Sequence, residues 1–250
     1  MHNLPNTVSL ITGGSRGIGR AIAEIFAENG SDVIITYKDN KKKAEKVKKL
    51  ICNKGGYCEI HKLDLSKKKS LDSFLKKIVK KHKKIDILVN NAGYLKQMSY
   101  LKIDQKEWYK TIDVNLTSVF FMIQSFAKLA IKQKNGNIIN ISSIGGQTGG
   151  VKAPHYAAAK LAIISITKSF SKLLAPYNTR VNAISPGIIE TDLVKKMIAV
   201  EGRSAINKSV PLKKIGNASN IADTALFLAS SQSEYMTGQV LNVNGGLFLG

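Results

Sequence analysis

The sequence predicts an α/β protein built on one doubly wound, seven-stranded parallel sheet with helices on both faces. Short apolar runs alternate with stretches of helical periodicity along all 250 residues. The runs are almost continuously apolar, as in strands that are covered on both faces. Because no linker or change of composition divides the chain, we expect residues 1–250 to form a single domain.

The expected elements follow in strand–helix order, six times, with a closing strand. The predicted strands are 8–12, 32–37, 57–63, 85–90, 136–142, 179–184 and 239–243. The predicted helices are 17–29, 41–54, 67–82, 104–132, 154–174 and 219–229. Segment 188–210 has few fixed features, and we expect it to form a lid over the substrate.

Composition argues against several classes of protein. No apolar run approaches the roughly 18 residues that span a bilayer. The first apolar run lacks a preceding basic region and leads into a glycine turn, so it is interpreted as a strand and the protein as cytoplasmic. Cys52 and Cys58 match no metal or redox spacing, so no metal site is predicted.

The formal net charge is +21, from 34 lysines and 4 arginines. Eighteen of the lysines lie between Lys38 and Lys84. This charge indicates either a docking surface for an acidic partner or a solvated surface that reflects compositional bias, and we favour the second. Few arginines and no basic motif interleaved with aromatics argue against specific nucleic-acid recognition.

The stretch from Thr12 to Gly19 follows the first predicted strand and opens the first helix. Its glycines allow a tight turn and a close approach to a pyrophosphate, and the helix start aims N–H groups at that charge. This context predicts a Rossmann-like dinucleotide-binding turn. In such sheets ligands bind outside the carboxyl ends of the strands, so the residues that follow each strand are the site candidates.

Tyr156 and Lys160 lie four residues apart at the start of a predicted helix and project from one face. An ammonium one turn away favours the phenolate, which would suit Tyr156 to acid–base work near pH 7. Ser143, thirteen residues upstream at the end of a strand, can reach the same pocket. His155, beside the tyrosine, is interpreted as a loop-lining residue.

Taken in order, these motifs resemble the short-chain dehydrogenase/reductase family from about residue 7 to residue 246. The resemblance rests on the ordered set of the glycine turn, Asp64, Asn90 to Gly93, Asn115, Ser143, Tyr156, Lys160, Pro186 and Gly187. Its spacing of the serine from the tyrosine selects Ser143 over Ser142.

The resemblance implies a role for each matching residue. Tyr156 would be the acid–base and Lys160 would lower its pKa and hold the nicotinamide ribose. Ser143 would orient the carbonyl, and Asn115 would hold a relay water. Residues that would bind the cofactor are Gly13, Ser15, Arg16, Gly17, Ile18, Gly19, Lys38, Asp64, Leu65, Asn91, Ala92, Gly93, Tyr156, Lys160, Pro186, Gly187, Ile189 and Thr191.

The end of the second strand predicts NADPH rather than NADH. NAD enzymes usually place a carboxylate there for the ribose 2′-hydroxyl, but this chain has Tyr37. Lys38 follows, and Arg16 lies in the glycine turn, so two cations face the expected place of a 2′-phosphate. Asp39 lies two positions further on and is expected to point to solvent.

Late segments resemble the 3-oxoacyl-[acyl-carrier-protein] reductase branch of fatty acid synthesis, among them Asn244 to Gly246. That branch implies a carbonyl substrate carried by an acyl carrier protein. Tyr94 to Gln97 and the loop 145–153 depart from its usual pattern, so a sugar, steroid-like or other small alcohol or ketone stays open. A non-catalytic NADP-binding protein and an anionic-surface binder stay as further alternatives.

The resemblance also implies a homotetramer, with helices 104–132 and 154–176 at one interface and the last strand at another. The aromatics of the first of these helices are interpreted as core or subunit contacts. They are Trp108, Phe120, Phe121 and Phe126.

Overall fold

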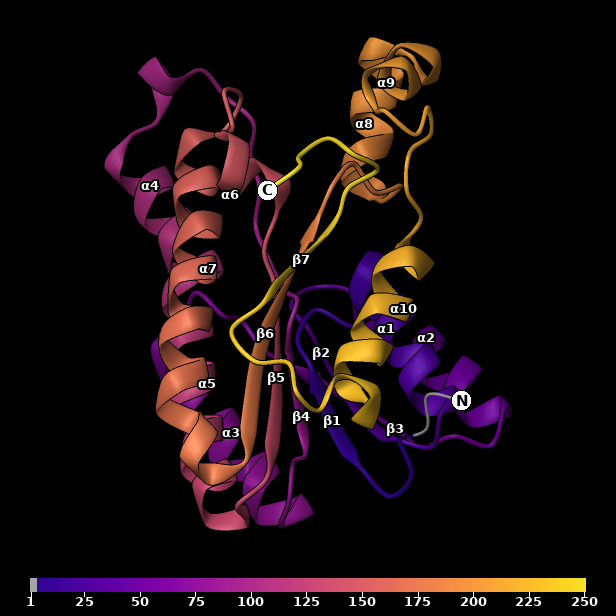
Figure 1. Cartoon of the computed structure of the whole chain (residues 1–250), viewed down its shortest axis with the longest axis vertical. Helices are drawn as coiled ribbons and strands as arrows, with labels where there is room; N and C mark the ends of the chain where they lie inside the picture. Colours follow the sequence, from indigo (N-terminus) through magenta and orange to yellow (C-terminus); the bar gives the residue numbers. More distant parts are fainter. Residues whose placement is uncertain (1–3) are drawn as a thin grey trace.

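The computed structural model describes residues 4–250, and it describes all side chains in this range except those of residues 68–70, 72, 193, 196, 197 and 201. Its centre is a seven-stranded sheet in the order β3-β2-β1-β4-β5-β6-β7, and every neighbouring pair is parallel (Figure 1). The predicted fold class is therefore confirmed. The strands are β1 Val8–Ile11, β2 Asp32–Tyr37, β3 Cys58–Lys62, β4 Ile87–Asn90, β5 Gly136–Ile141, β6 Thr179–Pro186 and β7 Val240–Val243.

Helices cover both faces of this sheet, with α1, α2 and α10 on one face and α3, α5 and α7 on the other (Figure 1). The helices are α1 Gly17–Glu28, α2 Lys41–Asn53, α3 Lys68–His82, α4 Gln105–Ile112, α5 Ser118–Gln133, α6 Ile144–Thr148, α7 Pro154–Leu174, α8 Asp192–Glu201, α9 Arg203–Ser209 and α10 Ala218–Ala229. The short 3-10 turns are η1 Tyr100–Lys102, η3 Ala175–Tyr177 and η4 Ser231–Ser233, and η2 Asp113–Thr117 is a π-helix.

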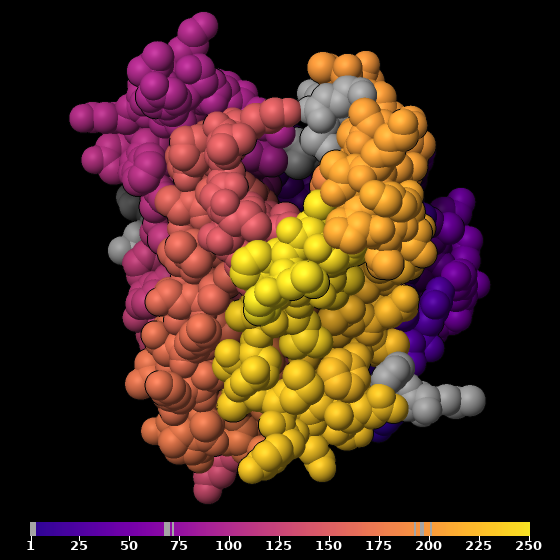
Figure 2. All heavy atoms as spheres, turned by 45° about the horizontal axis from the view of Figure 1, so that its top comes forward, coloured from indigo at the N-terminus to yellow at the C-terminus, as the bar shows by residue number. Residues whose placement is uncertain are grey.

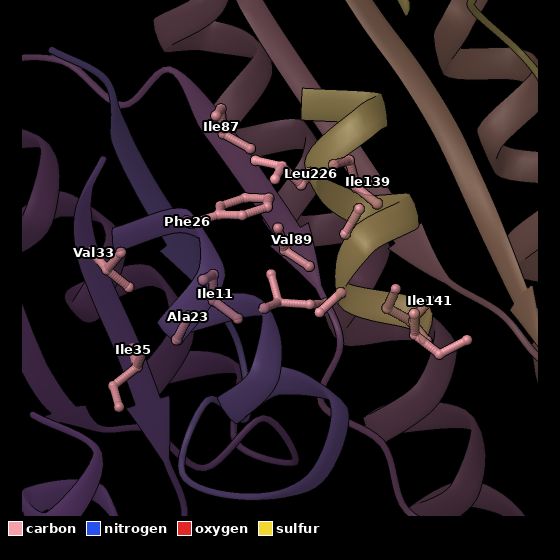
Figure 3. Close-up of a cluster of buried hydrophobic side chains, with 14 of the residues drawn as sticks. Ile11, Ala23, Phe26, Val33, Ile35, Ile87, Val89, Ile139, Ile141 and Leu226 are labelled. Atoms are coloured by element: carbon pink, nitrogen blue, oxygen red, sulfur yellow. The ribbon is translucent and has the colours of Figure 1, made fainter. Parts of the chain in front are cut away.

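The core between α1, α10 and the sheet follows from the spacing of small and apolar residues in α1. Gly19, Ile22, Ala23 and Phe26 are buried at the i, i+3, i+4, i+7 spacing of one helix face. Figure 3 shows Phe26 pointing into a cluster formed by residues of β1, β2, β4 and β5 together with Leu226 of α10. This packing fixes the start of α1 at the carboxyl end of β1.

The opposite core lies under α3, α5 and α7 and includes Leu71, Ile78, Met122 and Phe126. Residues Gln105–Gln133 form a helical stretch that is long and apolar enough, by length and composition alone, to cross a membrane. Half of its most apolar window is buried, and α5 packs on the sheet. It is a core helix of the α/β fold.

Two predicted segments differ from the structure. The predicted helix 104–132 is not one regular helix, because a π-helical turn at Asp113–Thr117 separates α4 from α5. Segment 188–210, for which no helix is predicted, contains α8 and α9, and Val194 and Ile206 of these helices form a small apolar cluster with Ile215. Most other boundaries differ from the prediction by one or two residues.

The carboxyl ends of the strands lie at the end of the molecule that carries α6, α8 and α9 (Figure 1). In the space-filling view this end is hollowed between the orange α8–α9 segment and the magenta-to-pink segment that runs from α4 to α6 (Figure 2). The residues that follow each strand, where the sequence predicts the site, therefore border one region.

Candidate active site

The glycine turn between β1 and α1 is held against the loop after β4 by one hydroxyl. Thr12 Oγ1 accepts from the backbone N–H groups of Asn91 and Ala92, both at 3.0 Å. The side-chain amide of Asn91 donates back to the carbonyls of Thr12 at 2.9 Å and Gly13 at 3.3 Å. Two segments almost 80 residues apart therefore form one rigid edge.

This edge has the shape of a pyrophosphate cradle. A Cβ on Gly19 would lie 2.3 Å from Asn91 Nδ2 and 2.5 Å from the Gly13 carbonyl oxygen, which no side chain tolerates. Gly13 and Gly17 have positive φ, the region that glycine enters without strain. No described side chain caps α1, and its first turn has no acidic residue, so its N–H groups and dipole face outward toward an anion. The turn thus fits a dinucleotide, with Ser15 and Ile18 half-buried within it.

Ser143 and Ser142 have different partners, although they are adjacent in sequence. Ser142 is buried and its hydroxyl donates to the Lys160 carbonyl at 2.7 Å, which ties β5 to α7. The Ser143 side chain lies close enough to the Tyr156 hydroxyl to lower its pKa. Ser143 also caps the short helix α6 by accepting from the N–H of Gly145 at 3.2 Å. Of these two serines, Ser143 is the one whose side chain acts on Tyr156.

Lys160 is buried beneath this pair, with 4% of its surface exposed. Its Nζ donates to the Ile141 carbonyl at 2.8 Å and lies 5.7 Å from the centre of the Tyr156 ring. Burial lowers the pKa of Lys160 to about 8. Burial also raises the pKa of Tyr156 to about 12, and the neighbouring Ser143 hydroxyl acts in the opposite direction. These two effects, and not Lys160, dominate the pKa of Tyr156, so its lowering by Lys160 stays a prediction.

Asn115 lies in the π-helical turn and is fully buried, and its side chain forms three hydrogen bonds. Its Oδ1 accepts from the Tyr94 N–H at 3.0 Å, and its Nδ2 donates to the carbonyls of Tyr94 at 2.8 Å and Thr111 at 2.9 Å. A Cβ on Gly93 would lie 3.0 Å from this Oδ1 and 3.8 Å from Lys160 Nζ. Asn115 therefore positions the loop after β4 beside Lys160, and its water-holding role stays a prediction.

The nicotinamide end predicted from sequence lies where β6 ends and α8 begins. Pro186 pairs with Val243 of β7, and Gly187 donates to the Val243 carbonyl at 2.9 Å. Ile189 is buried. A Cβ on Gly17 would lie 3.4 Å from Thr191 Cγ2, so the start of α8 lies over the glycine turn.

At the predicted adenosine end, Lys38 contacts Asp64 Oδ1 at 3.3 Å, and Leu65 is half-buried next to that carboxylate. The cofactor contacts of Lys38 and Asp64 stay predictions. The residues that share a partner are Arg16 and Lys43, which both contact Asp192 Oδ2. The sequence analysis missed Lys43 and Asp192, which lie 149 residues apart.

His155 lies in the first turn of α7, within the predicted helix 154–174, and is fully buried. Neither of its ring nitrogens has a hydrogen-bond partner among the described residues. Burial lowers its pKa, and the nearby Glu107 acts to raise it. Glu107 in turn contacts Lys96 at 3.2 Å, and both Tyr94 and Lys96 lower its pKa, so a polar cluster lies beside the tyrosine helix.

Comparison with known proteins agrees with this geometry. A short-chain dehydrogenase family described as enoyl-(acyl carrier protein) reductase matches residues 13–248. The chain belongs to the short-chain dehydrogenase/reductase family. It is 40% identical over 247 residues, 98% of each chain, to the 3-oxoacyl-[acyl-carrier-protein] reductase FabG of Aquifex aeolicus. It is 40% identical over 238 residues, 95% of each chain, to the enzyme of the same name from Chlamydia pneumoniae.

Solved structures of the family superpose on nearly the whole chain. A candidate NAD(P)-dependent gluconate 5-dehydrogenase of Beutenbergia cavernae, with bound NADP, has a TM-score of 0.94 at 28% identity and covers 98% of both chains. A candidate 2-deoxy-D-gluconate 3-dehydrogenase of Agrobacterium tumefaciens, also with NADP, has a TM-score of 0.90 at 32% identity and the same coverage. The protein is thus a short-chain oxidoreductase of a family that uses NAD(P), and the specific substrate is a separate question.

Proposed function

We propose that the protein reduces the 3-oxo group of an acyl chain borne by an acyl carrier protein, with NADPH as the reductant. The observation that carries this proposal is the placement of the Ser143 side chain beside the Tyr156 hydroxyl, above a buried Lys160. It offers two hydroxyls to one substrate oxygen. The relatives at 40% identity and near-complete coverage, which bear the name 3-oxoacyl-[acyl-carrier-protein] reductase, support the choice of substrate.

The residues divide the work of carbonyl reduction among themselves. NADPH, held by the glycine turn between β1 and α1, would supply the hydride for the reduction. Ser143 donates a hydrogen bond to the carbonyl oxygen and so fixes its position. Tyr156 gives its hydroxyl proton to the same oxygen as negative charge develops there. Lys160, with a pKa of about 8, is mostly an ammonium at pH 7 and stabilises the resulting phenolate.

The burial of Tyr156 favours the reduction of a carbonyl over the oxidation of an alcohol. Because it raises the pKa of Tyr156 to about 12, the hydroxyl stays protonated at neutral pH and is available as an acid.

NADPH is held in this proposal by the cradle described above. The N–H groups at the start of α1 would face the pyrophosphate, and Asn91 and Ala92 would line the adenosine ribose. The missing carboxylate at Tyr37 supports a 2′-phosphate rather than a 2′-hydroxyl.

The test is NADPH oxidation with acetoacetyl thioesters, first on a small thiol and then on acyl carrier protein. We expect turnover with both, and a loss of about a hundredfold or more in kcat for Tyr156→Phe, which removes only the proton donor. Unchanged activity in Tyr156→Phe would overturn the mechanism, whereas turnover with sugars and none with thioesters would overturn only the substrate.

A sugar acid is the second candidate substrate class, because the loop after β4 departs from the acyl-specific pattern. In place of that pattern stands a polar group in which Lys110 Nζ lies 4.0 Å from the centre of the Tyr94 ring and Lys96 pairs with Glu107. The two superposed structures named as gluconate-type dehydrogenases support the same alternative for this chain. Gluconate-dependent NADP+ reduction would distinguish it.

We also propose a cytoplasmic homotetramer. On the helices predicted to form one interface, Trp108 is 43% exposed, Phe120 37%, Leu161 52% and Leu173 62%. Phe120 stacks edge-on with Phe170 across α5 and α7, at 5.6 Å between ring centres. An apolar face of this kind, spread over two neighbouring helices, fits burial against a second copy.

A further inference from the structure

The Asp192 carboxylate forms ion pairs with two cationic side chains from distant parts of the chain. Its Oδ2 contacts Arg16 NH1 at 3.4 Å and Lys43 Nζ at 3.2 Å. Arg16 lies in the glycine turn, Lys43 in the first turn of α2, and Asp192 in the first turn of α8. These contacts hold the pKa of Asp192 below its usual range, with Lys43 as the main cause.

The local structure at the start of α2 places the Lys43 side chain near Arg16 and Asp192. The Asn40 side chain caps α2 by accepting from the Lys43 N–H at 2.9 Å, which fixes where the helix begins. Helical side chains lean toward the N-terminus, so a lysine in the first turn of α2 reaches back over the end of β2. A cation at a helix start is unfavourable for the dipole, so an anion at this point offsets that effect.

The Arg16 and Lys43 side chains together have the chemistry of a phosphate-binding site. Two nitrogens that contact the same oxygen lie close enough together to bind one small anion. All three side chains are partly exposed, at 67% for Arg16, 46% for Lys43 and 48% for Asp192, so a ligand can reach them. Lys38, the cation predicted from sequence, is instead engaged by Asp64.

We propose that Lys43, together with Arg16, binds the 2′-phosphate of NADPH, and that this phosphate replaces the Asp192 carboxylate between the two cations. The proposal rests on the proposed use of NADPH. Two anions cannot occupy the same pair of cations without strong repulsion, so phosphate binding releases Asp192. Because Asp192 opens α8, its release frees the start of the α8–α9 segment. Lys43 then decides cofactor specificity, and Asp192 connects cofactor choice to the segment over the site.

The experiment measures dissociation constants of NADPH and NADH, and of 2′,5′-ADP and 5′-AMP, by titration calorimetry on the whole protein. For Lys43→Gln we expect about tenfold weaker binding of NADPH and 2′,5′-ADP, the loss of one charge-assisted hydrogen bond, with NADH and 5′-AMP unchanged. Lys42→Gln is the matched control, since Lys42 is the exposed neighbour on the same helix, and it should change none of the four constants.

Asp192→Asn tests the displacement. Removing the competing carboxylate should tighten NADPH and 2′,5′-ADP by about twofold or more, and leave NADH unchanged. Equal effects of Lys43→Gln and Lys42→Gln, or no gain in Asp192→Asn, would overturn the inference while wild-type preference for NADPH stands. If instead the wild type binds NADH more tightly and Asp192→Asn weakens NADH, the carboxylate serves a ribose hydroxyl. The proposed cofactor itself is then wrong.

Discussion

Lys160→Met should make the protein more stable while it abolishes activity. Lys160 is buried, and its pKa falls from 10.5 in the free residue to about 8 in the folded chain. A difference of that size between folded and unfolded states corresponds to about 3 kcal/mol at pH 7, since one pKa unit is about 1.36 kcal/mol. Burial of the Lys160 ammonium therefore lowers the free energy of unfolding of the native protein by about 3 kcal/mol at pH 7.

Methionine removes that penalty but also removes the hydrogen bond to the Ile141 carbonyl, worth about 1 kcal/mol. The net gain expected at pH 7 is about 2 kcal/mol in the free energy of unfolding. The sign of its pH dependence follows from linkage. Between pH 8 and 10.5 the unfolded chain binds the Lys160 proton and the folded chain does not, so wild-type stability rises with pH in this window.

The assay is urea unfolding of wild type and variant without cofactor, at equal protein concentration, at pH 7.0 and 9.5. The advantage of Lys160→Met should shrink by about 2 kcal/mol between these pH values, because most of the wild-type penalty has been relieved at pH 9.5. A variant that is less stable than wild type at pH 7, or whose advantage does not change with pH, would refute the reasoning.

Ser143→Ala should lower kcat at least about tenfold and leave NADPH binding intact. Ser142→Ala should instead lower the free energy of unfolding by about 1–3 kcal/mol and leave kcat within about twofold. Steady-state kinetics and urea unfolding check both variants, and equal losses of kcat would contradict the assignment. Gly19→Ala should abolish NADPH binding in calorimetry, because its Cβ would lie 2.5 Å from a backbone oxygen that cannot move independently; retained affinity would show that the turn is not the cradle. Phe120→Asp should shift the sedimentation of a tetramer to smaller species, and unchanged sedimentation would place the interface elsewhere.

Sequence reasoning succeeded where the relevant contacts are local or where one pattern repeats. The seven strands and the main helices follow from apolar periodicity and glycine positions, and α7 has the same bounds in prediction and structure. Ser143 was separable from Ser142 by spacing, and the structure gives the two hydroxyls different partners.

Periodicity failed where a residue's surroundings come from distant parts of the chain. The π-helical turn has no marker of its own, because Asn115 bonds the Tyr94 backbone 21 residues upstream and the Thr111 carbonyl one turn before it. The helical position of His155 was predictable, because proline is favoured at the first position of a helix, but the burial of its imidazole depends on residues of other segments, such as Glu107. The α8–α9 segment has an apolar cluster too small to give a clear period.

Lys43 could not be predicted from the sequence because many lysines surround it. Among eighteen lysines between Lys38 and Lys84, proximity to the end of β2 selected Lys38, but the neighbouring strand β3 leads to Asp64, which takes that ammonium. One local signal does mark the turn that contains Lys43, although it does not distinguish Lys43 from Lys41 and Lys42. The first turn of α2 carries three lysines and no acidic residue, against the preference of the helix dipole. Positions that break a local rule tend to mark functional sites, and here the anion that the dipole lacks comes from α8, at Asp192.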